Sequence, residues 1–324
     1  MPDKLNVLVF GGGLGLGAYH AGVYEAFPLP LHWCCGSSVG AITCALIAGS
    51  PPEARVSALR AYWEQRAAVP VHSSAGPSRH AFAWMAALGT RLLGSEGHFH
   101  PRLPTAPLRF RSLYDLGPTR ERLARLVDFG RLNGGETRTT IATTDLKSGD
   151  VVLFDSTRDR ITLDHILASC GFLPEFAPLE IDGRWLADGG LSINAPFDPV
   201  LTEPASLRLY VIDVFARDGE VPASLEAASE RKSDLMMGNQ TYQRLRLGLS
   251  ARRLRWQLEQ HEMPDDTIYL LSYRPGAEEA GPEKSFDFSR SAIAQRWRAG
   301  GLDMQQADRA FRESDGIRQV RRGA

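Results

Sequence analysis

Three short stretches carry residue types that could perform nucleophilic catalysis. The first is the glycine-rich run Gly11–Gly17. The second places Ser38 in a Gly-x-Ser-x-Gly frame between Gly36 and Gly40, and the third is Asp188–Gly190. A serine hydroxyl, a carboxylate and a turn rich in backbone N–H groups are the parts that an acyl-transfer site needs.

The serine stands in the context of a nucleophile elbow. An apolar strand is expected at residues 31–35 and an apolar helix at 41–48, so Ser38 lies at the turn between them. Gly36 and Gly40 allow a sharp turn with close packing on both sides. A hydroxyl at the start of a helix also lies where developing negative charge is favoured. The pattern therefore predicts Ser38 as a nucleophile.

The first glycine run follows an expected strand at 5–10 and precedes an expected helix at 18–27. Its G-x-G-x-x-A pattern, residues 13–18, fits a dinucleotide-binding turn. That fingerprint also requires an acidic residue about twenty positions further on, at the end of the next strand. Residues 31–35 contain none. Donation of backbone N–H groups to an oxyanion is the favoured interpretation.

A serine nucleophile needs a base, and two kinds are available. In the order typical of α/β-hydrolases a histidine follows the serine, but His165 and His261 are not in turns that would present an imidazole. Asp188 ends an expected strand, and Gly189 and Gly190 let the backbone approach another loop closely. A carboxylate in a dry site can serve as the base. Asp188 is therefore favoured over a histidine triad.

The motifs together resemble the patatin-like phospholipase family. The resemblance rests on residues 12–26, 36–42 and 188–196, which occur in the family's order within residues 5–215. Residues 164–174 resemble the segment that precedes the family's catalytic aspartate. Residues 287–300 resemble the C-terminal extension of one bacterial subgroup.

The resemblance implies a Ser38–Asp188 dyad that hydrolyses lipid acyl esters without a cofactor. It implies an oxyanion hole formed by the backbone amides of Gly12, Gly13 and Leu14. It also implies a three-layer α/β/α fold with a mostly parallel central sheet. The glycines expected to support these motifs are Gly36, Gly40, Gly189 and Gly190.

Two positions depart from the family pattern. Many members carry a further glycine where Leu14 stands, and many carry Arg or Lys where Leu16 stands. The first departure bears on the geometry of the oxyanion turn. The second removes a positive charge that would have stood near the oxyanion.

The order of expected elements predicts one catalytic domain at 1–217 and an extension at 218–324. The chain opens strand–helix–strand–helix, which is typical of a parallel sheet covered by helices. Residues 70–115 break that rhythm with several prolines and are predicted to be an irregular insertion and candidate lid. The extension is predicted to be mostly helical and packed on the core.

Composition excludes several classes of function. A formal net charge of −1 argues against nucleic-acid binding. The four cysteines lack metal-ligand spacing and are expected to be free thiols, and His98 and His100 are expected to bind no metal.

No signal peptide or spanning segment is recognised, so a cytoplasmic protein is expected, with peripheral membrane contact left open. The arginines at 244–255 are interpreted as a solvated helix face.

The predicted function is therefore a serine esterase or lipase, similar to a phospholipase A or a lysophospholipase. Its partners would be lipid or other acyl-ester substrates. Two alternatives stay open at this stage. One is a non-catalytic lipid-binding or scaffold protein on the same fold, and the less favoured one is a dinucleotide-binding protein.

Overall fold

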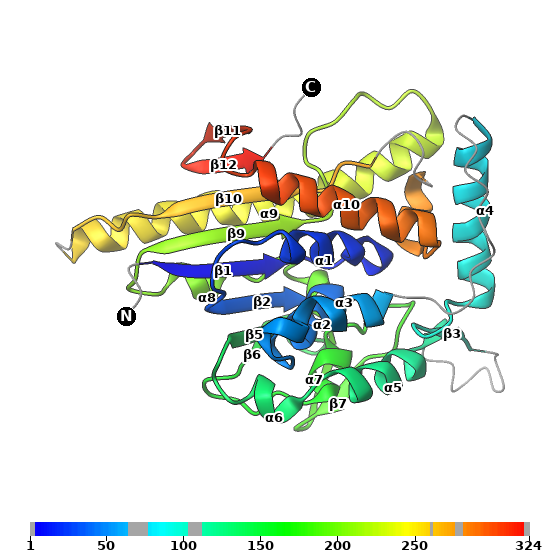
Figure 1. Cartoon of the computed structure of the whole chain (residues 1–324), viewed down its shortest axis with the longest axis horizontal. Coiled ribbons are helices and arrows are strands. Elements are labelled where there is room, and N and C mark those ends of the chain that lie inside the picture. The colour runs from blue at the N-terminus through cyan, green and yellow to red at the C-terminus, as the bar shows by residue number, and fades with distance from the viewer. Residues whose placement is uncertain (1–3, 64–76, 103–111, 260–261, 276–280, 321–324) are drawn as a thin grey trace.

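The computed structural model describes residues 4–63, 77–102, 112–259, 262–275 and 281–320 (Figure 1). Its centre is a ten-stranded sheet of order β11-β12-β10-β9-β1-β2-β5-β8-β7, with β6 also paired to β5. The strands are β1 (Leu5–Phe10), β2 (Trp33–Ser37), β5 (Arg138–Asp145), β6 (Val151–Asp155), β7 (Leu179–Ile181), β8 (Arg184–Asp188), β9 (Leu207–Asp213), β10 (Thr267–Ser272), β11 (Phe311–Ser314) and β12 (Ile317–Val320). A separate pair consists of β3 (His100–Pro101) and β4 (Tyr114–Asp115).

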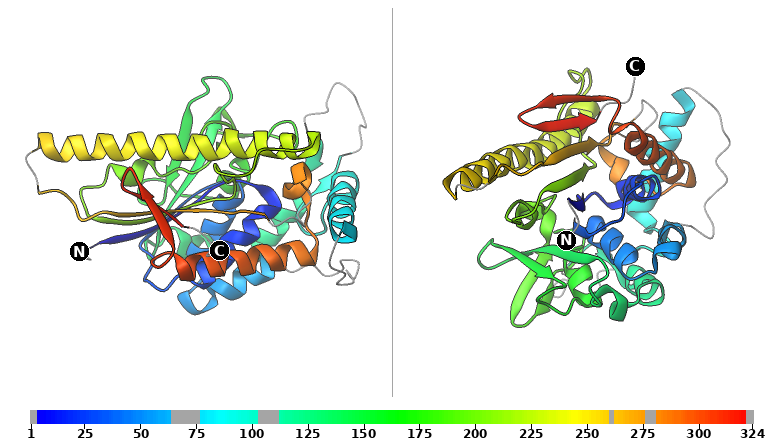
Figure 2. Two further views of the ribbon diagram at one scale, coloured as in Figure 1. Left: turned by 90° about the horizontal axis from the view of Figure 1, so that it is seen from above. Right: turned by 60° about the vertical axis from the view of Figure 1, so that its left-hand side comes forward.

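Neighbouring strands run parallel from β12 through β10, β9, β1 and β2 to β5. The α-helices are α1 (Ala18–Glu25), α2 (Val39–Ala48), α3 (Arg55–Trp63), α4 (Pro77–Leu93), α5 (Gly117–Leu126), α6 (Phe129–Leu132), α7 (Leu163–Ala168), α8 (Asp198–Leu201), α9 (Leu225–Leu258) and α10 (Arg290–Gln306). Short 3-10 helices are η1 (Leu14–Gly17), η2 (Pro52–Ala54), η4 (Gly189–Leu191) and η5 (Gly281–Phe286). Figure 2 shows α9 on one face of the sheet and α10 on the other. The predicted three-layer α/β/α fold is confirmed.

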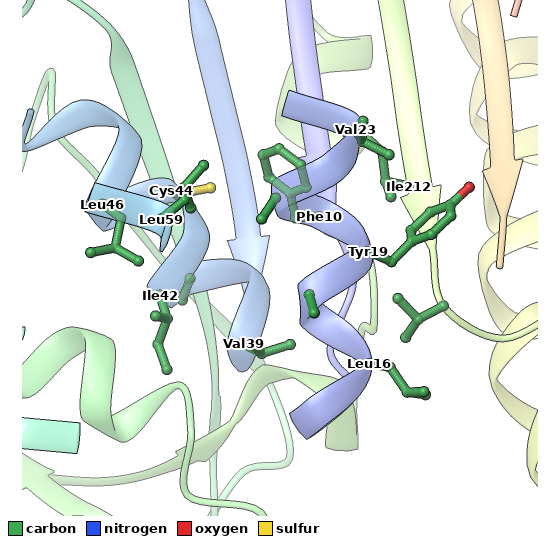
Figure 3. Close-up of a cluster of buried hydrophobic side chains, with 14 of the residues drawn as sticks. Phe10, Leu16, Tyr19, Val23, Val39, Ile42, Cys44, Leu46, Leu59 and Ile212 are labelled. Atoms are coloured by element: carbon green, nitrogen blue, oxygen red, sulfur yellow. The ribbon is translucent and has the colours of Figure 1, made fainter. Parts of the chain in front are cut away.

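The alternation of β1 explains why both faces of the sheet are covered. Leu8 and Phe10 belong to the cluster beneath α1 and α2, part of which is shown in Figure 3, whereas Val7 and Val9 belong to the cluster beneath α8 and α9. All four side chains are fully buried. A strand that is apolar on both faces can only be central, because each face needs a covering layer. The two glycine-rich turns therefore follow the two strands β1 and β2 at the middle of the sheet.

The C-terminal extension is tied closely to the first helix. A Cβ on Gly22 of α1 would lie 1.8 Å from the carbonyl oxygen of Trp297, and one on Gly300 would lie 2.1 Å from that of Tyr19. Glycine is required at both positions because the backbones of α1 and α10 nearly touch. The Tyr19 hydroxyl adds a buried hydrogen bond of 2.7 Å to the Asp303 carboxylate.

The structure corrects one sequence-based prediction and extends another. Residues 77–93 form the regular helix α4 instead of an irregular segment, while 70–76 and 103–111 lie outside the described residues. The segment 218–324 contributes α9 and α10 but also β10, β11 and β12, of which β10 pairs with β9 in the central sheet. The division into 1–217 and 218–324 stays a prediction.

Three smaller expectations concern the cysteines, the arginines of α9 and membrane-spanning helices. The four cysteines are free and buried. Arg252 is buried and pairs with Asp266 at 2.7 Å, so the arginine-rich stretch of α9 is not uniformly solvated. Among the described residues, no helix combines the length and the apolar character needed to cross a bilayer.

Candidate active site

Ser38 occupies the sharp turn between β2 and α2. Its backbone has φ 56° and ψ −126°, a conformation that non-glycine residues rarely adopt. The strain of such a turn is typical of a nucleophile elbow, in which the hydroxyl projects from the end of the strand. The Ser38 N–H donates to the Ser169 hydroxyl at 2.9 Å, and that hydroxyl donates to the Ala142 carbonyl at 2.7 Å. The elbow is thus fixed to β5 by Ser169.

The two glycines of the motif are required by close packing. A Cβ on Gly36 would lie 2.3 Å from the carbonyl of Gly40, and one on Gly40 would lie 2.1 Å from the carbonyl oxygen of Phe10. Real Cβ atoms do not approach backbone oxygens so closely, so α2 can start beside β1 only with glycine here. The same reason applies to Gly189, where a Cβ would lie 2.5 Å from the Ala142 carbonyl oxygen.

Register brings Asp188 to the serine although 150 residues separate them in sequence. In the parallel pair β2–β5, Ser37 stands opposite Ala142, and in the antiparallel pair β5–β8, Thr143 stands opposite Asp188. Ser38 and Asp188 therefore flank β5 at the same level of the sheet. Both side chains line one pocket.

The environment of Asp188 suits a base. The side chain is 1% exposed, and burial raises its pKa to about 7, while the Ser38 hydroxyl and the Gly190 amide counteract part of that rise. Oδ1 accepts from the Gly190 N–H at 2.7 Å. Oδ2 is buried and makes no hydrogen bond of standard geometry to the described residues. The Ser38 hydroxyl still acts on the pKa of this carboxyl, and catalytic hydrogen bonds are often long before substrate binds.

The first glycine turn borders the same pocket, but its amides differ. The Gly12 N–H donates to Asn194 Oδ1 at 3.0 Å and is therefore already engaged. Within the part of the chain that the structure describes, the N–H groups of Gly13 and Leu14 donate to no protein acceptor. Both residues line the pocket beside Ser38. Of the three predicted oxyanion donors, Gly13 and Leu14 are the two that have a free amide.

The two departures from the family pattern have visible consequences. Leu14 adopts φ 51°, in the left-handed region where glycine is favoured, so its side chain is accommodated with backbone strain. Leu16 is fully buried and carries no charge to the turn. The buried Arg296 of α10 lies against Gly15 of this turn, but its guanidinium donates to the carbonyls of Asp287 and Lys284.

The pocket has a volume of about 240 Å³ and mixed walls. Ser38, Asp188 and the glycine turn form one part of its lining. The part that α4, α9 and η5 contribute, called the outer wall below, includes Arg91, Glu230 and Lys284. Lys284 is 3% exposed and pairs with Glu230 at 3.0 Å and with Asp234 at 2.9 Å. The outer wall therefore offers charged groups of both signs.

A second, smaller cavity of about 40 Å³ also borders Ser38. Its walls are mainly apolar and aromatic, and Leu14, Ser38 and Phe172 line both cavities. The other apolar residues that line the smaller cavity are Val39, Ile42, Tyr62, Trp63, Phe99, Leu116, Phe176 and Phe288. Ser38 thus borders an apolar space and a charged one.

Of the described histidines, His165 is engaged in a helix cap, whereas His98 lines the smaller cavity with Ser38. His165 belongs to a capping box at the start of α7, where its Nδ1 accepts from the Thr162 N–H at 2.9 Å. His261 lies outside the described residues. His98 packs among aromatic rings near Ser95, and burial lowers its pKa to about 3. In the described ranges, no group of three or more His, Cys, Asp or Glu residues could hold a metal ion.

Two residues that organise the site were not assigned a role from sequence. Ser169 fixes the elbow, and Asn194 holds the glycine turn. Asn194 stands six residues after Asp188 within the third motif, and Ser169 lies within the segment 164–174 that precedes this motif. Their presence in the motif regions was a signal, but the partners of each side chain depend on strand register that sequence alone does not give.

Comparison with known proteins identifies the family of this chain. The family model described as patatin-like phospholipase matches residues 8–201, which include both glycine turns and Asp188. The chain belongs to the patatin-like phospholipases. Membership of this family supports a lipid acyl hydrolase activity. A search of curated protein sequences gave no match.

Two solved structures are similar to this patatin-like chain. VipD from Legionella pneumophila is 11% identical, with 94% of this chain and 66% of that chain covered and a TM-score of 0.43. The ExoU–SpcU complex of the type III secretion system of Pseudomonas aeruginosa gives 15% identity, 92% and 52% coverage, and a TM-score of 0.31. The chain thus spans less than two thirds of the length of each.

Proposed function

We propose that this protein is a serine esterase that hydrolyses acyl esters of lipids, with Ser38 as nucleophile and Asp188 as base. The observation that carries the proposal is the shared pocket. It is lined by Ser38, whose backbone is strained, and by the buried Asp188, whose pKa is raised to about 7. Gly13 and Leu14, whose amides donate to no described protein acceptor, line it as well. A carboxylate with that pKa is half ionised near neutral pH, which suits general-base work.

The reaction follows from these positions. Asp188 accepts the proton of Ser38 Oγ as that oxygen attacks the ester carbonyl. The amides of Gly13 and Leu14 stabilise the oxyanion, and losing one such donor costs about 3 kcal/mol of barrier. When the tetrahedral intermediate collapses, the alcohol leaves with the proton from Asp188. Asp188 then deprotonates a water molecule, which attacks the acyl-serine. When the second tetrahedral intermediate collapses, Ser38 Oγ takes the proton back from Asp188 and the acid is released.

The proposal places the two parts of the substrate in the two cavities. The apolar cavity of about 40 Å³ takes the first carbons of the acyl chain, and the larger pocket takes the alcohol portion. Charged groups of both signs on the outer wall, Arg91, Glu230 and Lys284, suit a polar headgroup. A phospholipase A or lysophospholipase activity is therefore the proposed substrate class.

Hydrolysis of a panel of esters by matched serine variants tests the proposal. Ser38→Ala should lower kcat/KM by at least a thousandfold. Ser37→Ala is the matched control, because Ser37 is the buried neighbour on β2 and does not line the pocket. It should stay within threefold of the wild-type protein. Activity that survives in Ser38→Ala, or a wild-type protein inert toward every ester, would favour the alternative of a non-catalytic lipid-binding protein.

We further propose that the pocket mouth contacts a lipid surface through α4. This helix contributes Arg91 to the outer wall, and η5 contacts both α4 and α9 at the same end of the molecule (Figures 1 and 2). Its large exposed apolar side chains are Trp84, Met85, Leu88, Leu92 and Leu93. So much exposed apolar surface on one helix beside a lipid-hydrolase pocket is typical of interfacial binding.

Sedimentation with phosphatidylcholine vesicles tests the lipid contact. Met85→Gln/Leu92→Gln should reduce the bound fraction at least fivefold while leaving hydrolysis of a soluble short-chain ester unchanged. Leu258→Gln is the matched control: this leucine is 83% exposed but stands at the opposite end of α9 (Figure 1). Equal vesicle binding by the double variant and the wild-type protein would exclude α4 as the contact.

A further inference from the structure

The glycine turn that borders Ser38 is held residue by residue against the end of β9. The Gly11 N–H donates to the Ile212 carbonyl at 2.9 Å. A Cβ on Gly13 would lie 2.4 Å from the Val214 side chain, so this peptide rests directly on the residue after β9. Between them, the Gly12 N–H donates to a side chain, Asn194 Oδ1, at 3.0 Å.

Asn194 is placed so that its amide has one allowed orientation. The side chain is 3% exposed, and its backbone N–H donates to Gln240 on α9 at 2.8 Å. Oδ1 faces the Gly12 N–H, and Nδ2 faces Asp213 Oδ1 at 3.5 Å. A flipped amide would set NH₂ against N–H and oxygen against carboxylate. The pair Gly12 and Asp213 therefore fixes which end of the amide is acceptor and which is donor.

Asp213 is a carboxylate kept in the interior at the end of β9. It is 1% exposed, and its Oδ1 also accepts from the Phe215 N–H at 3.0 Å. Burial raises its pKa to about 6; the Thr241 hydroxyl and the Phe215 and Val214 amides lower it, and the negative charge of Asp234 raises it. At neutral pH it is mainly ionised, so it holds the NH₂ end of Asn194 by charge.

These contacts leave the backbone amides of the turn in two different states. The Gly12 N–H is directed to Asn194, and the next two amides, those of Gly13 and Leu14, have no described protein acceptor and belong to residues that line the pocket. If the turn could rotate freely, the Gly12 amide could reach the pocket and the amides of Gly13 and Leu14 would move away from their present positions. The anchor at Gly12 thus fixes which amides can reach an oxyanion.

We propose that Asn194, oriented by Asp213, is a positioning residue that sets the oxyanion turn of this site. The proposal rests on the esterase function proposed above. Asn194 takes no proton and forms no bond to substrate. It acts through Gly12 by keeping the two following amides aimed at the carbonyl that Ser38 attacks.

Exchanging the side chains of Asn194 and Asp213 tests the contacts that run from Asp213 through Asn194 to Gly12, called the relay below. Asn194→Asp sets two carboxylates against each other and should lower kcat ten- to a hundredfold with KM within threefold of the wild-type value. Asp213→Asn should lower it less, because Asn194 keeps its acceptor toward Gly12. The double variant Asn194→Asp/Asp213→Asn restores one acceptor for Gly12 and one donor between the side chains. Its kcat should be at least tenfold higher than that of Asn194→Asp.

A pH series separates positioning from general damage to the fold. In Asn194→Asp the two carboxylates can share a proton at low pH, and the protonated partner then donates to the one that accepts from Gly12. The ratio of its kcat to that of the wild-type protein should therefore rise as pH falls from 8 to 6. In the double variant this ratio should be flat. Asn133→Asp, which alters a structural amide bonded to Ile161 away from the pocket, should lower stability and leave kcat within threefold.

Hydrogen–deuterium exchange in the peptide covering residues 10–17 gives a readout that does not need turnover. Asn194→Ala should speed exchange at Gly12, and the double variant should restore protection. If the wild-type protein hydrolyses no ester, the proposed function fails while exchange still tests the relay. The relay is overturned if Asn194→Ala leaves exchange unchanged, or if the double variant is no more active and no better protected than Asn194→Asp.

Discussion

Replacing Asp188 by asparagine should abolish hydrolysis and at the same time make the folded protein more stable. The carboxylate is fully buried, and its pKa rises from 3.8 to about 7 because burial penalises the charged form. Asparagine has the same shape, and its Oδ1 can still accept from the Gly190 N–H. The substitution therefore removes the base and the buried charge together.

The sign and size of the effect follow from proton linkage. Between about pH 4 and pH 7 the folded chain holds a proton on Asp188 that the unfolded chain has released, so wild-type stability falls as pH rises through this range. The difference between 3.8 and about 7 is worth about 4 kcal/mol. Asp188→Asn does not titrate. Its free energy of unfolding should exceed that of the wild-type protein by about 4 kcal/mol at pH 8 and by close to zero at pH 4.

Urea unfolding of both proteins from pH 4 to pH 8.5 measures the difference directly. Asp213, whose pKa is also raised by burial, titrates in both proteins and cancels. In parallel, wild-type kcat/KM should rise with pH and level off above about pH 7, because the ionised form is the base. A stability difference that is constant with pH, or a variant less stable than the wild type at pH 8, would refute the buried-charge account of Asp188.

Three further predictions concern the surroundings of the dyad. Leu14→Gly should be more stable than Leu14→Ala by about 1 kcal/mol, the reverse of the usual order, because residue 14 has φ 51°; chemical unfolding measures this. Phe172→Ala should join the two cavities beside Ser38. The ratio of kcat/KM for an octanoyl ester to that for a butyryl ester should then rise about fourfold for each additional methylene that becomes buried. Phe154→Ala, which alters a residue outside both cavities, should leave this ratio unchanged. Gly40→Ala should prevent stable folding, since its Cβ would lie 2.1 Å from the Phe10 carbonyl oxygen, while Gly89→Ala, with open space around it, should be tolerated in circular dichroism and thermal melts.

The parts of the structure that sequence predicted are those governed by local pattern. The strand–turn–helix around Ser38 follows from an apolar run, two glycines and a second apolar run, and the structure places β2 and α2 there. The hairpin of β7 and β8 is local in the same way, because Asp182 and Gly183 between them are a residue pair that favours a two-residue turn. In these cases side-chain period and turn chemistry act within a few residues, so that sequence carries the information.

The parts that sequence did not predict depend on contacts between distant segments. α4 was expected to be irregular because prolines and glycines surround it, yet Pro77 stands at its first position, where proline is tolerated. β10 joins the central sheet through pairing with β9, which no local pattern in 267–272 specifies. The engagement of Gly12 by Asn194 is of the same kind, because it depends on how the loop after β8 lies beside β1.

The most direct test of the Ser38–Asp188 assignment is the site and rate of reaction with a fluorophosphonate probe, read by mass spectrometry of the labelled peptide. The account predicts a single adduct on Ser38 whose rate of formation rises with pH up to about 7 and then levels off. It also predicts that labelling is almost lost in Asp188→Asn and unchanged in Ser37→Ala. An adduct on any other residue, or labelling of Asp188→Asn at the wild-type rate, would contradict the assignment.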